Sequence, residues 1–255
     1  EGVVYFEGRY SPHRLLTEKA KHSARDIVEA VARGFRRGKE DFGVDARQIL
    51  AMICGLPQHN WELLSLVESC KDMGVVGIDV AGSTSGADEK YEESVLQVFQ
   101  EAYKKGIHRT VHAGESGGAK EVISALNEMH AERIGHGYRI LRDEEAYRKY
   151  FIHQRRAHLE GCPLSSVMTG AVDPDWSKHP VKRWAEDGVH FSISRDDPTC
   201  FDNTHKNEMD LVHTKIGLTI HQLWKAQLNA ANASFAEEPL KNEIIAKIVA
   251  AEPPK

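Results

Sequence analysis

Seven short apolar runs, each rich in β-branched or aromatic residues, alternate along the chain with stretches whose apolar residues recur at helical spacing. This alternation is typical of repeated strand–helix units, which build a parallel sheet with helices packed on it. The expected strands cover residues 3–11, 47–56, 75–82, 108–115, 133–138, 157–163 and 189–198. From about residue 218 to about residue 250 the pattern predicts helix without a further strand.

Three amphipathic stretches define the expected helices most clearly. Ser23 and Asp26 form a capping-box pattern, and Ile27, Val31 and Phe35 then follow at helical spacing, so a helix is expected to begin after Ser23. Two further apolar stripes consist of Tyr91, Val95, Val98 and Ala102, and of Val122, Leu126 and Met129. Each stripe lies between two expected strands, as βα units require.

The strand count leaves two architectures open. A closed barrel of parallel strands needs eight strands, one more than these residues supply. A doubly wound open sheet would accommodate seven, but the glycine-rich phosphate turn expected after its first strand is absent. No internal repeat, low-complexity linker or hinge divides the 255 residues, so we expect one domain over residues 1–255.

Composition and charge exclude several classes of protein. The net charge of -5 and the absence of a long basic run argue against a nucleic-acid-binding surface. No run of about eighteen apolar residues occurs, so no membrane span is expected. The four cysteines show no CxxC spacing, which favours reduced thiols in a cytoplasmic protein over a disulfide framework.

Unusual polar or glycine residues follow the expected strands, at the point where each strand ends. They are Arg9, His13, Gly82, His112, Glu115, His136, Cys162, Asp196 and Asp197. In a parallel barrel the carboxyl ends of the strands meet at one rim, which is where the active sites of that architecture lie. Together these residues therefore predict a site, although each has an ordinary structural explanation.

The ordinary explanations differ from residue to residue. His112 could be a strand-end histidine bonded to a backbone carbonyl, and Glu115 could favour a helix N-terminus. His136, between two glycines, could belong to a glycine turn. Asp196 and Asp197 could form a turn or a helix cap. Alternatively, if strand neighbours point to opposite sides, one carboxylate of this pair could bind a metal while the other meets a substrate.

A metal ion would give these residue types a common purpose. Imidazole and carboxylate ligands suit zinc, which lowers the pKa of a bound water to about 7. A nearby histidine could hold or deprotonate that water, and a carboxylic acid could protonate a leaving group or a ring nitrogen. Cys162, followed by Pro163, is expected to be a core residue.

Four motifs in fixed order resemble the adenosine deaminase family of amidohydrolase-type barrels. They are "TVHAGE" at 110–115, "RIGHGY" at 133–138, "CPLSSVMTGA" at 162–171 and "SISRDDP" at 192–198. "RYSPH" near the start and "IDVAG" at 78–82 agree with them. The resemblance implies an α/β fold of the (β/α)8 TIM-barrel class. It also implies zinc-dependent hydrolytic deamination of adenosine and 2′-deoxyadenosine to inosine and 2′-deoxyinosine, in purine salvage.

The resemblance also implies roles for single residues. His112 and Asp196 match zinc ligands, and His136 matches the histidine that orients or deprotonates the zinc water. Glu115 matches the acid that protonates purine N1. Asp197 matches the carboxylate that faces purine N7.

Two further positions match less directly. The backbone of Gly82 matches the family's contact to purine N3. Asp79 matches a supporting position whose role the resemblance does not specify. The implied partner is therefore a small purine nucleoside, with neither nucleic acid nor membrane.

The sequence departs from the family pattern in one major respect. The family's first strand carries a His-x-His pair that supplies two zinc ligands, and no His-x-His occurs in these residues. We therefore expect the given residues to begin at the family's second strand, with the first strand absent and the domain incomplete at its N-terminus. Two alternatives stay open. One is an inactive fragment or non-catalytic relative that binds without turnover, and the other is a related AMP or adenine deaminase.

Smaller departures lie near the expected site. Arg195 stands where the family usually has threonine, and Ser83 stands where an acidic residue is common. Gly8 and Gly161 occupy positions usually filled by aliphatic residues. Strand alternation from Asp196 predicts that the Arg195 side chain faces away from the rim.

Overall fold

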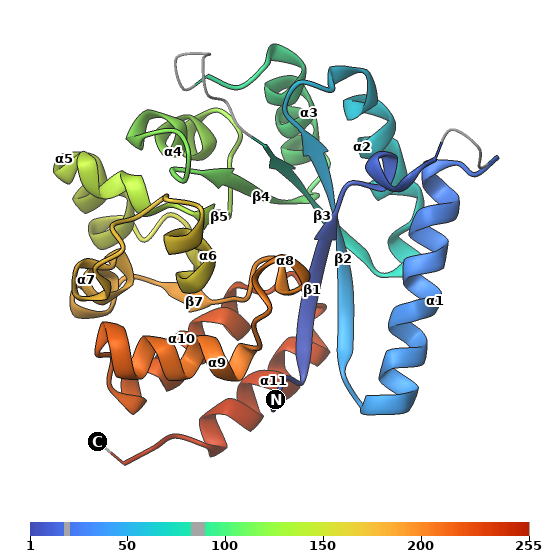
Figure 1. The fold of residues 1–255 in the computed structure, drawn as a ribbon. Coiled ribbons are helices and arrows are strands. Elements are labelled where there is room, and N and C mark those ends of the chain that lie inside the picture. Colours follow the sequence, from blue (N-terminus) through green and yellow to red (C-terminus); the bar gives the residue numbers. More distant parts are fainter. Residues whose placement is uncertain (18–20, 83–89, 255) are drawn as a thin grey trace.

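A computed structural model of the chain describes residues 1–17, 21–82 and 90–254, and Ser83 lies outside these ranges. Seven parallel strands form one curled sheet in which each strand pairs with the next along the chain (Figure 1). The strands are β1 (Tyr5–Tyr10), β2 (Asp45–Ile53), β3 (Val75–Ala81), β4 (His108–Ala113), β5 (Arg133–His136), β6 (His158–Gly161) and β7 (Phe191–Ile193). All seven predicted strands are confirmed, although the last is much shorter than expected.

Helices cover the outside of the curled sheet (Figure 1). The α-helices are α1 (Ala24–Phe42), α2 (Asn60–Ser69), α3 (Glu93–Lys104), α4 (Ala119–Asn127), α5 (Glu144–Tyr147), α6 (Pro163–Met168), α7 (Pro180–Glu186), α8 (Pro198–Phe201), α9 (His205–Leu211), α10 (Ile220–Ala233) and α11 (Glu238–Ala250). Short 3-10 helices are η1 (Pro12–Leu15), η2 (Pro57–His59), η3 (Lys71–Met73), η4 (Tyr138–Arg142) and η6 (Trp176–Lys178), and π-helical turns are η5 (Arg148–His153) and η7 (Val212–Ile216). None of the helices in the described ranges is long and apolar enough to cross a membrane.

Helix α1 begins and ends with the predicted signals. The Ser23 hydroxyl accepts a hydrogen bond from the Asp26 N–H, and the Asp26 carboxylate accepts one from the Ser23 N–H at 2.7 Å. The helix ends at Gly43, whose φ of 71° suits glycine. Its most buried residues are Ala24, Val28 and Ala32. The predicted apolar stripe lies beside them and is half-buried.

The core fills the space between the sheet and its helices. The predicted stripes of α3 and α4 are buried, and Phe99 joins the first of them. Trp184 of α7 is fully buried and stacks on Tyr138 with ring centroids 5.4 Å apart. These apolar layers leave the inner face of the sheet to a different set of side chains.

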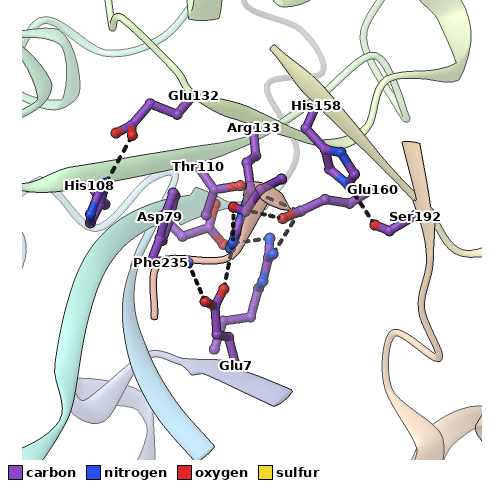
Figure 2. Close-up of polar contacts among 12 residues, drawn as sticks. Glu7, Asp79, His108, Thr110, Glu132, Arg133, His158, Glu160, Ser192 and Phe235 are labelled. Atoms are coloured by element: carbon purple, nitrogen blue, oxygen red, sulfur yellow. Dashed lines mark hydrogen bonds and ion pairs between the residues drawn. The ribbon is translucent and has the colours of Figure 1, made fainter. Parts of the chain in front are cut away.

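The inner face of the sheet carries a network of buried charges (Figure 2). Glu160 of β6 accepts a hydrogen bond from Arg9 at 2.6 Å and forms an ion pair with Arg133, whose Nε atom lies 2.8 Å away. Arg133 also contacts the Glu7 carboxylate at 2.5 Å, and Arg9 lies 3.6 Å from the Asp79 carboxylate. Since charged groups are buried in proteins mainly when they are paired, these five residues stabilise one another as a unit.

Phe235, in the segment between α10 and α11, contacts the charge network at the amino ends of the strands. The Phe235 N–H donates to Glu7 at 2.6 Å, and the Arg133 guanidinium lies 3.7 Å from the Phe235 ring centroid. His108, at the start of β4, stacks on the same ring with centroids 4.5 Å apart. The carboxyl ends of the strands are therefore the end at which a site can form.

The edges of the sheet are β1 and β7. A closed (β/α)8 barrel has no such edges, because every strand pairs on both sides. The seven strands thus form part of a (β/α)8 barrel in which one strand position, between β7 and β1, is missing from the described sheet. This agrees with the expected absence of the first strand from these residues.

Candidate active site

A cavity of about 390 Å³ lies at the carboxyl ends of the strands. Its lining residues are Gly82, His112, Ala113, Glu115, Ser116, Glu121, Arg139, Thr169 and Ala171. His136 and Asp196 lie beside it, since the His136 Nε2 atom is 3.6 Å from the Glu115 carboxylate and 3.9 Å from the Asp196 carboxylate. The structure therefore brings together residues that the sequence predicted from three different strand ends.

The orientation of His112 is set by Asp79. The two Asp79 carboxylate oxygens lie 2.9 and 3.1 Å from the His112 Nδ1 atom, and the Asp79 side chain is fully buried. Burial opposes protonation of His112, but Asp79 outweighs it, so the pKa of His112 lies above its ordinary value. With Nδ1 held by a carboxylate, Nε2 is the nitrogen presented to a metal, which is a common arrangement for histidine ligands.

His136 is a buried imidazole held on a strained backbone. Its φ is 67°, a left-handed conformation that costs free energy in most residues and is most often found where function requires it. The next residue, Gly137, also has a positive φ, and a Cβ atom there would lie 2.5 Å from Leu159. Burial and the nearby His112 ring lower the pKa of His136. The ring is therefore neutral near pH 7 and able to accept a proton.

Asp196 and Asp197 lie in the loop after β7 rather than on the strand. Because β7 ends at Ile193, the expected strand alternation of these carboxylates was wrong as a reason for their opposite roles. Asp196 instead has a φ of 60°, and its carboxylate accepts a hydrogen bond from the Ser165 hydroxyl at 2.6 Å. Asp197 precedes α8, but its side chain makes no capping hydrogen bond. Burial and the neighbouring Asp196 raise the pKa of Asp197.

Glu115 lies in the cavity before the helix that follows β4. The N-cap of α4 is Gly118, so Glu115 precedes the helix and its N-terminal turn. The first-turn acid is Glu121, which sequence reasoning missed and which accepts from the Gly114 N–H at 2.7 Å. Glu115 accepts a long hydrogen bond of 3.4 Å from Thr169 and keeps about 27% of its side chain exposed. It is therefore accessible to a ligand in the cavity.

The donor atoms near the cavity fit a metal ion. His136, Cys162 and Asp196 have potential ligand atoms within 4.8 Å of one another, and His112 presents its Nε2 atom from β4. Imidazole nitrogen and carboxylate oxygen are zinc donors. Cys162 is buried, as expected for a core residue, and burial raises the pKa of its thiol well above the ordinary value. The protonated thiol makes Cys162 a weaker candidate ligand than His112 and Asp196.

Of the other predicted residues, Arg195 and His13 are not among those that line the cavity, whereas Gly82 is. Arg195 forms an ion pair with Glu1 at 3.6 Å, and because it follows the end of β7, strand alternation was wrong as the reason for its orientation. His13 lies against His59, with ring centroids 4.2 Å apart. Gly82 lines the cavity and has a φ of 100°, a conformation that favours glycine.

Sequence reasoning missed side chains that contact the candidate site residues or belong to the inner charge network. Glu160, Arg133 and Ser165 were not singled out, and Arg9 was identified only as a strand-end residue. Polar residues spaced two apart within a strand, such as Glu7 with Arg9 and His158 with Glu160, are the signal that could have found Arg9 and Glu160, because such residues share one face.

Comparison with known proteins agrees with these observations. A family model described as adenosine deaminase matches residues 1–251. The adenosine deaminase of Danio rerio is 37% identical over 255 residues, which covers 96% of this chain and 70% of that protein.

Solved structures share the fold. The N6-methyl-AMP deaminase from Arabidopsis thaliana superposes with a TM-score of 0.84 at 26% identity, covering 98% of this chain and 74% of that one. An amidohydrolase from Burkholderia ambifaria, solved with bound Zn, gives a TM-score of 0.86 at 22% identity, covering 98% of this chain and 68% of that one. The expected (β/α)8 fold class, with seven strands present in these residues, is thereby confirmed.

Proposed function

The chain belongs to the adenosine deaminase family, and we propose that it deaminates adenosine and 2′-deoxyadenosine hydrolytically to inosine and 2′-deoxyinosine. The observation that carries this proposal is the meeting of Glu115, His136 and Asp196, whose polar atoms lie 3.6–3.9 Å apart beside the cavity. An acid, a neutral base and a metal-binding carboxylate are the three groups that addition of water to a purine ring requires.

We assign the metal as zinc, held in this chain by His112 and Asp196. The ligand types support this assignment, and Asp79 supplies the hydrogen bond that zinc-bound histidines commonly make. The resemblance to the family implies two further ligands from a His-x-His pair, a pattern that the given sequence lacks. When bound, zinc would lower the pKa of a water ligand to about 7.

The proton transfers belong to Glu115 and His136. Hydrolysis adds water across the C6–N1 bond of the purine, which needs a base for the water and an acid for N1. His136, kept neutral by burial, takes the proton from the attacking water, and Glu115 delivers a proton to N1. The proton held by His136 then passes to the amino group at C6, which leaves as ammonia, and the C6 hydroxyl returns its proton to Glu115 as the carbonyl of inosine forms.

Asp197 and Gly82 orient the purine. The N7 and N3 atoms are hydrogen-bond acceptors, so each needs a donor from the protein. Burial and Asp196 raise the pKa of Asp197, and in its acid form this carboxyl would donate a hydrogen bond to N7. The backbone N–H of Gly82, which lines the cavity, is the proposed donor to N3.

A nucleotide deaminase is the second candidate, because the Arabidopsis N6-methyl-AMP deaminase has a similar fold at 26% identity. A phosphate-bearing substrate would need cationic partners. In the described part of the cavity wall, Arg139 is the cation, while Glu115 and Glu121 contribute carboxylates. This balance favours an uncharged nucleoside over a nucleotide.

The location is proposed as the cytoplasm, within purine salvage. All four cysteines are free thiols, and Cys70 and Cys162 are buried in the core. Reduced cysteines are typical of the cytoplasm.

The fall in ultraviolet absorbance as adenosine becomes inosine tests the proposal. We expect Glu115→Gln to lower kcat roughly 100-fold to 10,000-fold while zinc content and circular dichroism stay unchanged. Glu128→Gln, an exposed change beyond α4, is the control and should keep full activity. Unchanged turnover in Glu115→Gln would exclude the assigned acid. Absence of turnover in zinc-loaded protein would support a non-catalytic relative instead, and a preference for AMP or N6-methyl-AMP would support the nucleotide alternative.

A further inference from the structure

A second group of metal-binding side chains lies outside the cavity, where the loops after β1 and β2 meet. His13 belongs to η1, His59 is the last residue of η2, and Glu62 lies in the first turn of α2. The two imidazole rings are stacked with an interplanar angle of 19°, and the His13 Nε2 atom lies 3.1 Å from a Glu62 carboxylate oxygen. The proposed deamination uses none of these three residues.

His13 is the unusual member of this group. Its side chain is only 4% exposed, yet neither ring nitrogen has a hydrogen-bond partner among the described residues. The Glu62 oxygen is near enough but is not aligned for a hydrogen bond. Buried polar atoms in folded proteins nearly always have a partner, so the unpaired nitrogens of His13 point to a ligand.

The spacing of the group suits one ion. Ligand atoms from His13, His59 and Glu62 all lie within 4.8 Å of one another. Two imidazoles and one carboxylate form a frequent zinc ligand set, with a fourth position left for water. His59 is half-buried and Glu62 is exposed, so an ion can enter from solvent.

The electrostatic state of the rings is compatible with binding. Burial and the neighbouring His13 ring lower the pKa of His59, so protons compete little for its nitrogens near pH 7. A metal lies in the plane of each imidazole that binds it, whereas these rings are stacked face to face. The more accessible His59 ring must therefore turn out of the stack when the ion binds.

We propose that His13, His59 and Glu62 form a second zinc site, separate from the deaminase cavity. The ion would join η1, which follows the edge strand β1, to the start of α2, which follows β2. Binding would thereby tie the edge of the sheet to the next strand–helix unit and stabilise the folded chain. The alternative is a plain stacked pair beside an acid that favours the N-terminus of α2.

Zinc counting on the full chain tests this proposal. Metal-free protein is dialysed against buffered ZnCl₂, and bound zinc per chain is measured for the wild type and for the double variant His59→Asn, Glu62→Gln. The buried His13 is left unchanged so that the fold is preserved. We expect the wild type to bind one zinc more than the double variant, whatever the occupancy of the cavity. His22→Asn, which removes an exposed histidine outside the group, should bind as much as the wild type. Equal zinc in the wild type and the double variant would overturn the proposal.

Thermal unfolding gives a second readout. Above the dissociation constant, each tenfold rise in free zinc should raise the Tm of the wild type by roughly 3–5 °C more than that of the double variant. MgCl₂ should not reproduce this difference, because magnesium prefers oxygen ligands. A crystal soaked in ZnCl₂ should show anomalous scattering about 2.0–2.2 Å from the donor atoms of His13, His59 and Glu62. Anomalous scattering at other positions only, or an equal Tm shift in both proteins, would contradict the site.

Discussion

The Asp79 carboxylate lies 2.9 Å from the His112 Nδ1 atom, and this contact decides which imidazole nitrogen faces the cavity. Asp79 is fully buried on β3, and it also lies 3.6 Å from Arg9. The inner charge network and the proposed metal ligand are therefore joined through one carboxylate. Loss of the Asp79 charge should therefore affect both the orientation of His112 and the ion pair with Arg9.

Asp79→Asn is expected to weaken zinc binding and deamination by roughly 10-fold to 100-fold, because the amide no longer holds His112 as a charged acceptor. Zinc affinity from competition with a chelator and kcat/KM for adenosine measure the effect. Asp45→Asn, which removes the 2.7 Å ion pair between Asp45 at the start of β2 and Lys39 of α1, is the matched control. Wild-type zinc affinity in Asp79→Asn would show that Asp79 does not position His112.

The charge network itself predicts a large difference between two Glu–Arg pairs of similar length. Glu160 lies 2.6 Å from Arg9 and is buried, whereas Glu237 lies 2.7 Å from Arg47 and is 57% exposed. Glu160→Gln leaves the buried Arg133 and the half-buried Arg9 short of a charge, and it should lower the free energy of unfolding by about 3–5 kcal/mol. Glu237→Gln should cost less than about 1 kcal/mol. Urea unfolding of both variants checks the contrast, and similar losses would show that burial does not govern these pairs.

The two unusual glycines predict a second contrast in stability. A Cβ atom at Gly161 would lie 3.1 Å from the Ser192 carbonyl oxygen and 3.2 Å from Val181. At Gly8 it would lie 2.9 Å from the tip of Phe35, a half-buried ring that can turn aside. We expect Gly161→Ala to cost roughly 1–3 kcal/mol and Gly8→Ala to cost less.

Unfolding curves for the two alanine variants decide this point. The double variant Gly8→Ala, Phe35→Leu should recover part of any loss at Gly8, because it removes the tip of the ring. A larger loss for Gly8→Ala than for Gly161→Ala would mean that Phe35 is held more rigidly than its exposure indicates.

The packing around the two glycines is a part of the structure that could not be predicted from the sequence. At Gly8 and Gly161 the space of an aliphatic side chain is taken by Phe35 and by Val181 with Trp184. These partners lie 20 or more positions away in the chain, and no local pattern connects them. The seven strands were predictable because a short apolar run between two stretches of helical spacing is a local signal.

That these candidate residues lie together was predictable for a different reason. Parallel strands place their carboxyl ends together, so strand-end residues such as His112, Glu115 and His136 could be grouped without a structure. The backbone at Asp196 could not be predicted, because its positive φ and its bond to Ser165 depend on where β7 leaves the sheet. The pairing of Glu7 with Arg133 likewise needs the curvature of the whole sheet, which joins residues 126 positions apart.

Two buried histidines away from the proposed metal ligands predict how stability changes with pH. Burial lowers the pKa of His158 to about 3 and that of His179 to about 4. In the unfolded chain both would titrate near about 6.5. Between about pH 6.5 and about pH 4 the unfolded state therefore binds more protons than the folded state. The free energy of unfolding should fall with decreasing pH there, by up to about 1.4 kcal/mol per pH unit for each histidine.

Glu160 contributes in a different pH range. Burial of this carboxyl is outweighed by Arg9 and Arg133, so its pKa lies far below the usual range. Its stabilisation is present above the unfolded pKa of about 4.3 and is lost only as the pH falls below that value. Between about pH 6.5 and about pH 5, the pH dependence of the free energy of unfolding therefore includes contributions from His158 and His179 but none from Glu160.

His179→Asn separates one histidine from the other. The His179 Nδ1 atom accepts from the Val181 N–H at 3.3 Å as the cap of α7, and asparagine can take over that bond. Urea unfolding between about pH 7 and about pH 5 should show a slope smaller than that of the wild type, by up to about 1.4 kcal/mol per pH unit. His22→Asn, at an exposed position, should keep the full slope. If His179→Asn also kept the full slope, His179 would have to be protonated in the folded state, and its burial beside Ser166 would not suppress its titration.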